Sequence, residues 1–161
     1  MKQICYEPIG LLYTPFSQPS GGPIQPCGAG EALGRAELRP ELAPALEGLE
    51  GFSHLILLYH CHRAAAFKPK VKPFLDRNEH GLFATRAPSR PNPLGLSVVE
   101  LVVMEGNVLH LKGVDMLDQS PLIDLKPYVP KFDCPPGEVR TGWLSERAQD
   151  ASGKKADERF S

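Results

Sequence analysis

The residues from 96 to 114 contain two runs of β-forming side chains, 96–104 and 108–114, separated by Glu105, Gly106 and Asn107. Gly-Asn is a dipeptide that favours a two-residue turn between antiparallel strands. The pattern therefore predicts a tight β-hairpin through Gly106 and Asn107. Because a hairpin is a pair of antiparallel strands, it indicates a fold class that contains β-sheet.

Other segments also have the length and composition of strands. The 17 prolines and 15 glycines among 161 residues imply many turns and short elements. One helix is predicted after Pro40, where Leu42, Leu46 and Leu49 recur at helical spacing. The near-continuous apolar run 53–62 predicts a central strand buried on both faces. Further strands are expected over 4–13, 34–38, 82–85 and 122–128.

Short strands joined by glycine and proline turns, with few helices, indicate an all-β protein, either a barrel or a sandwich. We expect one domain over residues 1–145, followed by a polar tail over 146–161. The polar composition from residue 151 onward predicts a frayed end, whereas Trp143 and Leu144 are expected to dock.

Residues 83–97, with the sequence FATRAPSRPNPLGLS, form an unusually stiff polar stretch. Each proline fixes its own φ angle and restricts the residue before it. Such a loop, joining two strands at a sheet edge, can present Arg86, Arg90 and Asn92 to an anionic partner. A proline-rich connector with solvated arginines is the alternative.

Charge is unevenly distributed, although the net charge is only −1. From residue 63 to residue 90 the chain has seven basic residues and two acidic ones, so this tract carries +5 and the remainder carries −6. Such a tract could contact phosphates. A solvated lysine-rich loop explains it equally well.

No apolar run approaches the length of about 18 to 20 residues that spans a bilayer, so no membrane partner is expected. Residues 1–10 lack the apolar core of a secretory signal. The four cysteines are scattered, which predicts reduced, buried thiols in a cytoplasmic protein.

Two weaker patterns suggest other kinds of site. Gly28, Gly30 and Gly34 superficially match a dinucleotide-binding loop, but the third glycine is one residue late and no strand precedes it. His60 and His62 would share one strand face, as two metal ligands could. Because no carboxylate-bearing partner motif lies near them, a hydrogen-bonded polar face is favoured and no metal is predicted.

The sequence DMLDQSPLIDLKPY, residues 115–128, has the densest set of polar side chains. Its carboxylates could accept hydrogen bonds from a ligand or act as a general base. Alternatively, Asp115 and Asp118 could form turns, and Asp124 could pair with Lys126 on the same strand face.

The motifs PIGxxxTPF, PIQP, LEGFSHLILLYHCH, FATRxPxRPNPxGLS and DxxDxxPxxDxKPY occur in this order between residues 8 and 133. In this arrangement the chain resembles the TsaA/TrmO-like family. The resemblance implies a small β-barrel methyltransferase that binds S-adenosylmethionine without a Rossmann sheet. It also implies a homodimer that methylates the exocyclic nitrogen of threonylcarbamoyl-adenosine beside the tRNA anticodon.

By this resemblance, two polar loops and the end of the central strand converge on the cofactor. The implied contacts are Pro23, Ile24, Gln25, His62, Arg63, Arg86, Leu96, Asp115, Met116, Leu117 and Asp118. The chain departs from the family's common pattern at Ile24, where many members have arginine, and at Gln119-Ser120, where Gly-Thr is commoner.

Methyl transfer requires alignment of donor and acceptor and removal of a proton from a weakly nucleophilic nitrogen. Asp124 or Tyr128 could accept that proton, while Lys126 or Arg90 could stabilise charge on the carbamoyl oxygen or the threonyl carboxylate. Methylation of a small molecule and non-catalytic binding of S-adenosylmethionine or of a metal are the rival functions.

Overall fold

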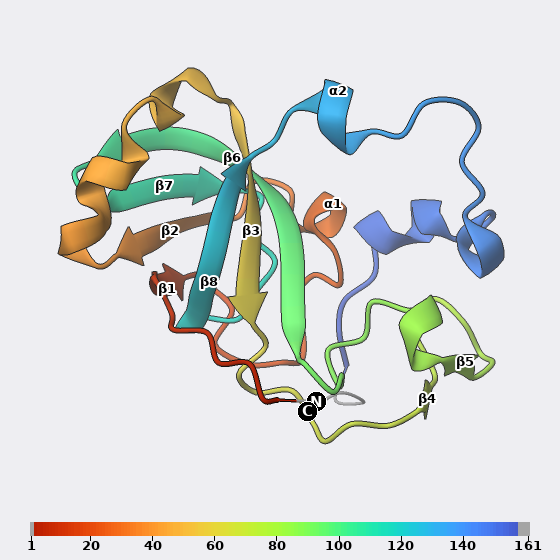
Figure 1. Cartoon of the computed structure of the whole chain (residues 1–161). Coiled ribbons are helices and arrows are strands. Elements are labelled where there is room, and N and C mark those ends of the chain that lie inside the picture. The colour runs from red at the N-terminus through yellow and green to blue at the C-terminus, as the bar shows by residue number, and fades with distance from the viewer. Residues whose placement is uncertain (1, 158–161) are drawn as a thin grey trace.

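The computed structural model describes residues 2–157. Within them, six antiparallel strands close a barrel in the order β1-β2-β7-β6-β3-β8 (Figure 1). The all-β barrel predicted from the sequence is thus confirmed. The barrel strands are β1 (Gly10–Tyr13), β2 (Leu33–Leu38), β3 (His54–His60), β6 (Leu94–Glu105), β7 (Val108–Lys112) and β8 (Ser120–Pro127).

The apolar core fills the inside of this barrel. Its buried side chains come from all six strands, from residues 46 and 49 and from the turn over residues 114–116, and along a strand successive side chains point alternately into and out of this core. The core consists of Leu12, Ala36, Leu38, Leu46, Leu49, Leu55, Leu57, Tyr59, Val99, Leu109, Leu111, Val114, Met116 and Leu122.

Strand β3 lies between β6 and β8, but the prediction that both of its faces are buried is wrong. Leu55, Leu57 and Tyr59 point into the core, whereas Ile56 and Leu58 are only half-buried on the outer surface. A barrel has a single interior, so a strand with neighbours on both sides still buries only every second residue.

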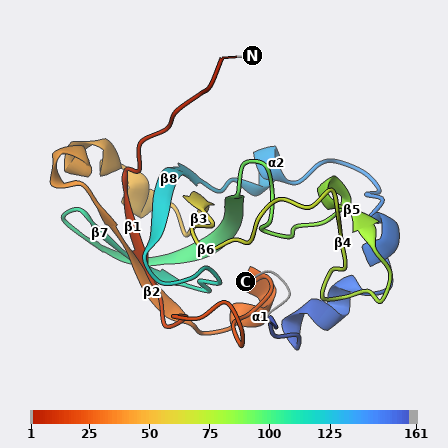
Figure 2. The ribbon, with the colours of Figure 1, turned by 90° about the horizontal axis from the view of Figure 1, so that it is seen from below.

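The first strand is shorter than predicted. Pairing of β1 with β2 begins at Gly10, while Ile4 and Tyr6 are exposed and the residues before β1 run away from the barrel (Figure 2). Gly10 is itself the first residue of β1. A Cβ atom at this position would lie 2.3 Å from the carbonyl oxygen of Glu37, so glycine permits the close approach of β1 and β2.

The hairpin between β6 and β7 is confirmed. Glu105 pairs with Val108, and Gly106 has a φ angle of 62°, which glycine adopts without strain. β7 ends at Lys112, two residues before the predicted end, and Gly113 then turns the chain with a φ angle of 80°.

The helix predicted after Pro40 is a 3₁₀ helix, η1 (Pro40–Leu46), followed by a second 3₁₀ turn, η2 (Leu49–Gly51). Pro44 lies inside η1 and cannot donate a backbone hydrogen bond, which excludes a regular α-helix. Gly48, with a φ angle of 83°, separates the two turns. Leu46 and Leu49 nevertheless bury their side chains.

Residues 64–89 form a side lobe beside the barrel, at the right of Figure 1. It contains a two-stranded ribbon, β4 (Lys70–Val71) and β5 (His80–Gly81), and the 3₁₀ helix η3 (Leu82–Ala84), where a strand was predicted. The stiff loop therefore joins η3 to β6 and does not join two sheet edges. A small cluster of Val71, Leu82 and Ala87 is the lobe's apolar core.

The chain then crosses from β8 to the side lobe through α2 (Pro130–Asp133), η4 (Gly142–Leu144) and η5 (Ala148–Ser152). The short helix α1 (Pro26–Ala29) lies next to η5 (Figure 1). Ala151 is buried and Ala156 exchanges two backbone hydrogen bonds with Gly21 and Gly22. The predicted fraying is therefore wrong for residues 151–157; residues 158–161 lie outside the described part.

The cysteines differ from expectation in their burial. Cys5, Cys27 and Cys134 are exposed and Cys61 is half-buried, all four as free thiols. Among residues 2–157, no helix has the length and apolar character needed to cross a membrane.

Candidate functional site

A cavity of about 860 Å³ lies between one end of the barrel, the side lobe and the helices η4 and η5. This volume is in the range of pockets that hold small molecules. The structure brings the predicted loops together here, as the motifs indicated. The predicted residues that line the cavity are Pro23, Ile24, Gln25, His62, Arg63, Arg86, Arg90, Leu96, Asp115, Met116 and Leu117.

The arginines of the cavity fix the surrounding loops in place. Arg86 donates a hydrogen bond of 2.9 Å to the side-chain oxygen of Gln25. Arg63 donates to the carbonyl oxygen of Ser17 at 2.8 Å and to Gln18 at 3.3 Å. Segments that lie about 45 to 60 residues apart in the chain are thereby tied together around the cavity.

Arg90 has a similar orienting role within its own loop. Its guanidinium donates to the carbonyl oxygens of Thr85 at 3.0 Å and Ala87 at 3.4 Å, and lies 5.4 Å from the centre of the Phe83 ring. The loop is therefore stiffened by hydrogen bonds as well as by its prolines.

A chain of buried hydrogen bonds runs from the barrel interior to the cavity. Tyr59 and Ser97 are hydrogen-bonded through their hydroxyl groups at 3.1 Å, and Ser97 donates to a carboxylate oxygen of Asp115 at 2.5 Å. Gly95 makes room for this arrangement, because a Cβ atom there would lie 2.3 Å from the Tyr59 ring. Sequence reasoning missed Tyr59 and Ser97, although their alternation along β3 and β6 places both inside.

Asp115 is the most unusual titratable group in the cavity. Burial raises its pKa to about 6, against the opposing effects of the Ser97 hydrogen bond and the positive charge of Arg86. Burial and the nearby Asp115 also raise the pKa of the Cys61 thiol to about 11, and the same two causes raise the pKa of Tyr59. The carboxylate of Asp115 is thus buried and incompletely compensated by the protein's own cations.

His62 lies at the end of β3, exposed at the cavity, with its Nδ1 atom 3.4 Å from the Ser120 hydroxyl. Desolvation and the neighbouring Arg63 lower its pKa. These effects disfavour the charged form of the imidazole. Within the described residues, no cluster of three or more potential metal ligands is present.

Four predicted site residues lie outside the cavity. Asp118 accepts a hydrogen bond of 3.0 Å from the backbone amide of Thr14, which fits a turn-forming role. Asp124 and Lys126 form an ion pair of 2.7 Å, and Tyr128 contacts the Cys134 thiol at 3.3 Å. The pairing of Leu58 with Asp124 and Ile56 with Lys126 puts the two charged residues on the outer face of β8.

The sequence profile described as the tRNA-methyltransferase O N-terminal domain matches residues 11–134. The chain belongs to this TrmO family. A probable S-adenosyl-L-methionine-binding protein of Pyrococcus abyssi is 47% identical over 157 residues, covering 98% of this chain and 85% of the relative. The human tRNA (adenine(37)-N6)-methyltransferase is 38% identical over 136 residues, which cover 80% of this chain and 31% of the human protein.

Solved structures agree with the family assignment. The crystal structure of TrmO from Pseudomonas aeruginosa superposes with a TM-score of 0.75 at 40% sequence identity. The match covers 88% of this chain but 62% of the Pseudomonas chain, so this TrmO-family protein spans less than two thirds of that relative.

Proposed function

We propose that this protein is a methyltransferase that uses S-adenosylmethionine to methylate the exocyclic nitrogen of threonylcarbamoyl-adenosine beside the tRNA anticodon. The names of the relatives support the cofactor and a tRNA adenine as the acceptor, and the threonylcarbamoyl group on that adenine is part of the proposal. The observation that carries the proposal is the buried Asp115 carboxylate in the cavity, since an incompletely compensated anion favours a cationic ligand. S-adenosylmethionine has such a charge on its sulfonium.

The residues that line the cavity fit this ligand. Asp115 is placed to face a positive charge, and the backbone and side chains around Pro23, Ile24, Gln25 and Leu96 give a largely apolar wall. We propose that these residues, with His62, Arg63, Arg86, Met116 and Leu117, hold S-adenosylmethionine, and that Asp118 acts indirectly by fixing the turn that presents Asp115.

S-adenosylmethionine would supply a methyl group already activated by the sulfonium. The protein must therefore align the acceptor nitrogen and accept its proton. Arg90 is anchored at the cavity and is suited to stabilise negative charge on the carbamoyl group. Asp124, Lys126 and Tyr128 are proposed for proton transfer and charge stabilisation, but they lie on the outer face of their own subunit.

A homodimer would reconcile these positions. Leu94 and Leu96 of β6 are about half exposed and line the cavity. On the outer face of the barrel Leu96 pairs with Leu58 of β3, and Leu58 pairs in turn with Asp124 of β8. We propose that a second copy packs on this face, so that Asp124 and Lys126 of one subunit act at the cavity of the other. Exposed apolar area next to a site is typical of such interfaces.

The shared site can be tested by mixing two inactive variants. Asp115→Asn damages the cavity and Asp124→Ala removes the outer carboxylate. If Asp124 acts across the dimer, refolding an equal mixture restores about a quarter of the wild-type methylation, since half the dimers are mixed and each has one intact site. No recovery, with mixed dimers verified by tagged subunits, would show that the site is not shared.

The tRNA substrate is supported by the basic tract in the side lobe, where Lys68 and Lys70 are exposed. Contacts of these lysines with phosphates would make binding weaken steeply with salt, whereas turnover of a small molecule would be nearly independent of salt.

Mass analysis of tRNA nucleosides from cells with and without the gene tests the substrate directly. An unchanged methylated threonylcarbamoyl-adenosine peak contradicts the proposal. A cytoplasmic location follows from this substrate and is part of the same proposal.

A further inference from the structure

One wall of the cavity lies outside residues 11–134, the part of the chain that the family profile matches. The family match ends at residue 134, but residues of η4, η5 and the strand-like segment after η5 also line the cavity. These residues are Trp143, Leu144, Ala148, Ala151 and Ala156. Residues 141–157, here called the C-terminal segment, therefore complete the enclosure that the barrel and the side lobe leave open.

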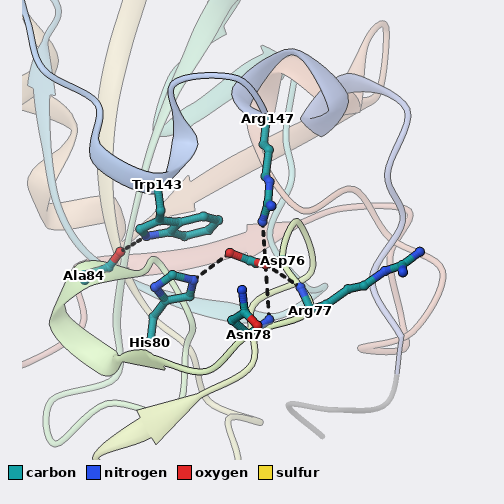
Figure 3. Close-up of polar contacts among 7 residues, drawn as sticks. All are labelled: Asp76, Arg77, Asn78, His80, Ala84, Trp143 and Arg147. Atoms are coloured by element: carbon teal, nitrogen blue, oxygen red, sulfur yellow. Dashed lines mark hydrogen bonds and ion pairs between the residues drawn. The ribbon is translucent and has the colours of Figure 1, made fainter.

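Asp76 of the side lobe anchors this segment (Figure 3). Its side chain is only 5% exposed and forms an ion pair with Arg147, while its other oxygen lies 2.8 Å from the Nε2 atom of His80. The backbone amides of Arg77 and Asn78 donate hydrogen bonds of 2.6 and 3.1 Å to the carboxylate oxygen that pairs with Arg147. These interactions, led by Arg147, hold the pKa of Asp76 well below its usual range, so the carboxylate is charged at neutral pH.

Trp143 forms the second contact of the segment with the lobe (Figure 3). The indole stacks on the His80 ring with the centroids 4.6 Å apart and the planes 21° apart. Its Nε1 donates to the carbonyl oxygen of Ala84 at 2.8 Å. Asp76 also orients His80. One carboxylate therefore positions both Arg147 and the imidazole ring on which Trp143 stacks.

The other end of the segment is joined to the loop at the opposite side of the cavity. The amide of Gly21 donates to Ala156 and the amide of Ala156 donates to Gly22, each at 2.8 Å. Gly28 packs against η5 so closely that a Cβ atom there would lie 3.0 Å from the carbonyl oxygen of Ala151. The segment thus bridges two loops that flank the cavity.

We infer that the C-terminal segment is part of the S-adenosylmethionine site, with Trp143 contacting the bound ligand and Asp76 acting as a positioning residue that holds the segment closed. The inference rests on the proposed cofactor. The segment is tied to the lobe by the Asp76–Arg147 ion pair, the Trp143 hydrogen bond and the stack on His80, and Ala151 is the one residue of the segment that is fully buried. Because the segment lies outside the barrel core, loss of the anchor should open it without unfolding the barrel. The apparent affinity then falls in proportion to the closed fraction.

Trp143 is the only tryptophan in the chain, so its fluorescence reports directly on this contact. In Asp76→Asn, the emission should shift to the red in the ligand-free protein, because the indole leaves His80 for water. Trypsin should cut faster after Arg147 and Lys154. Glu79→Gln is the matched control: it removes one negative charge from the same loop, at an exposed position, and should leave both signals unchanged.

Titration with S-adenosylmethionine should show about tenfold weaker binding by Asp76→Asn if a tenth of the molecules stay closed. Gly28→Ala places a methyl group against the carbonyl oxygen of Ala151 and should also lower the affinity for S-adenosylmethionine. Gly51→Ala is its control, because the space around Gly51 is open, and its affinity should equal that of the wild type. Unchanged affinity in both variants, together with wild-type Trp143 emission, would overturn the inference.

The two proposals fail in different ways. A wild-type protein that binds no S-adenosylmethionine would contradict the proposed cofactor, and with it the ligand contact of Trp143. Wild-type binding that Asp76→Asn leaves intact, although the segment has opened by fluorescence and proteolysis, would contradict the further inference alone.

Discussion

The barrel and the side lobe are stabilised by different kinds of interaction. The barrel closes a continuous antiparallel ladder around a large apolar core. The lobe has a two-stranded ribbon and an apolar cluster of Val71, Leu82 and Ala87, and depends on the charged Asp76 to hold the C-terminal segment. The cavity lies between them, so one wall is backed by the large barrel core and the other by a small cluster and polar contacts, and we expect the second wall to open more easily.

The largest effect should come from the barrel core. Leu57→Ala removes a fully buried side chain and should lower the free energy of unfolding by about 3 kcal/mol. The loss should be the same by far-UV circular dichroism and by Trp143 fluorescence, because the lobe cannot remain ordered once the barrel unfolds. Chemical denaturation at constant pH measures both signals.

Leu82→Ala is the matched change in the lobe, where the leucine is also buried. Here the Trp143 signal should be lost at lower denaturant concentration than the circular dichroism signal. Coincident transitions in this variant would show that the lobe and the barrel form one cooperative unit and do not differ in stability.

Asp115→Asn should stabilise the protein and impair its function. The pKa of Asp115 is raised, so its contribution to stability is present below the ordinary carboxyl pKa and is lost as the pH rises through about 6. A neutral amide has no such penalty, and the variant should therefore be more stable than the wild type by about 3 kcal/mol at pH 8.

At pH 4 this advantage of Asp115→Asn should disappear, since the wild-type carboxyl is then protonated. Thermal or urea unfolding at the two pH values measures the difference. A variant less stable than wild type at pH 8 would mean that Asp115 is well compensated in the ligand-free protein, which would remove the argument for a cationic ligand.

The smallest effect concerns the turn that presents Asp115. Gln119 has a φ angle of 61°, in the left-handed region that side chains other than glycine adopt at a cost. Gln119→Gly should therefore raise the free energy of unfolding by about 0.5 kcal/mol, since part of the relief is offset by the entropy of glycine. Affinity for S-adenosylmethionine should not change, and a loss of stability would show that the glutamine side chain makes a compensating contact.

The sequence predicted the hairpin and the barrel because both depend on local alternation and turn residues, as Gly106 illustrates. The resemblance also named most residues that line the cavity. It could not place Asp124. The register between β3 and β8 shifts there, because Leu58 of β3 pairs with Asp124 and the next residue, Tyr59, pairs with Leu122, and this shift decides which side chains of β8 turn outward.

In the C-terminal segment, the expected docking of Trp143 is confirmed by its contacts with His80 and Ala84, whereas the order of residues 151–157 was beyond prediction from composition. The segment's polar residues are typical of a frayed tail, yet Arg147 meets Asp76 and Trp143 meets Ala84 across long separations in the chain. Only the folded side lobe creates these partners. Likewise, the apolar run of β3 cannot show whether one face or both faces will be buried.

Calorimetric titration of S-adenosylmethionine at pH 5 and pH 8 tests the central claim most directly, namely that the cavity between barrel and lobe binds this cation through Asp115. Binding should strengthen as the pH rises through about 6, where the carboxyl loses its proton, and this dependence should be absent in Asp115→Asn. No binding at either pH, or equal affinity of the wild type and Asp115→Asn at pH 8, would contradict the account.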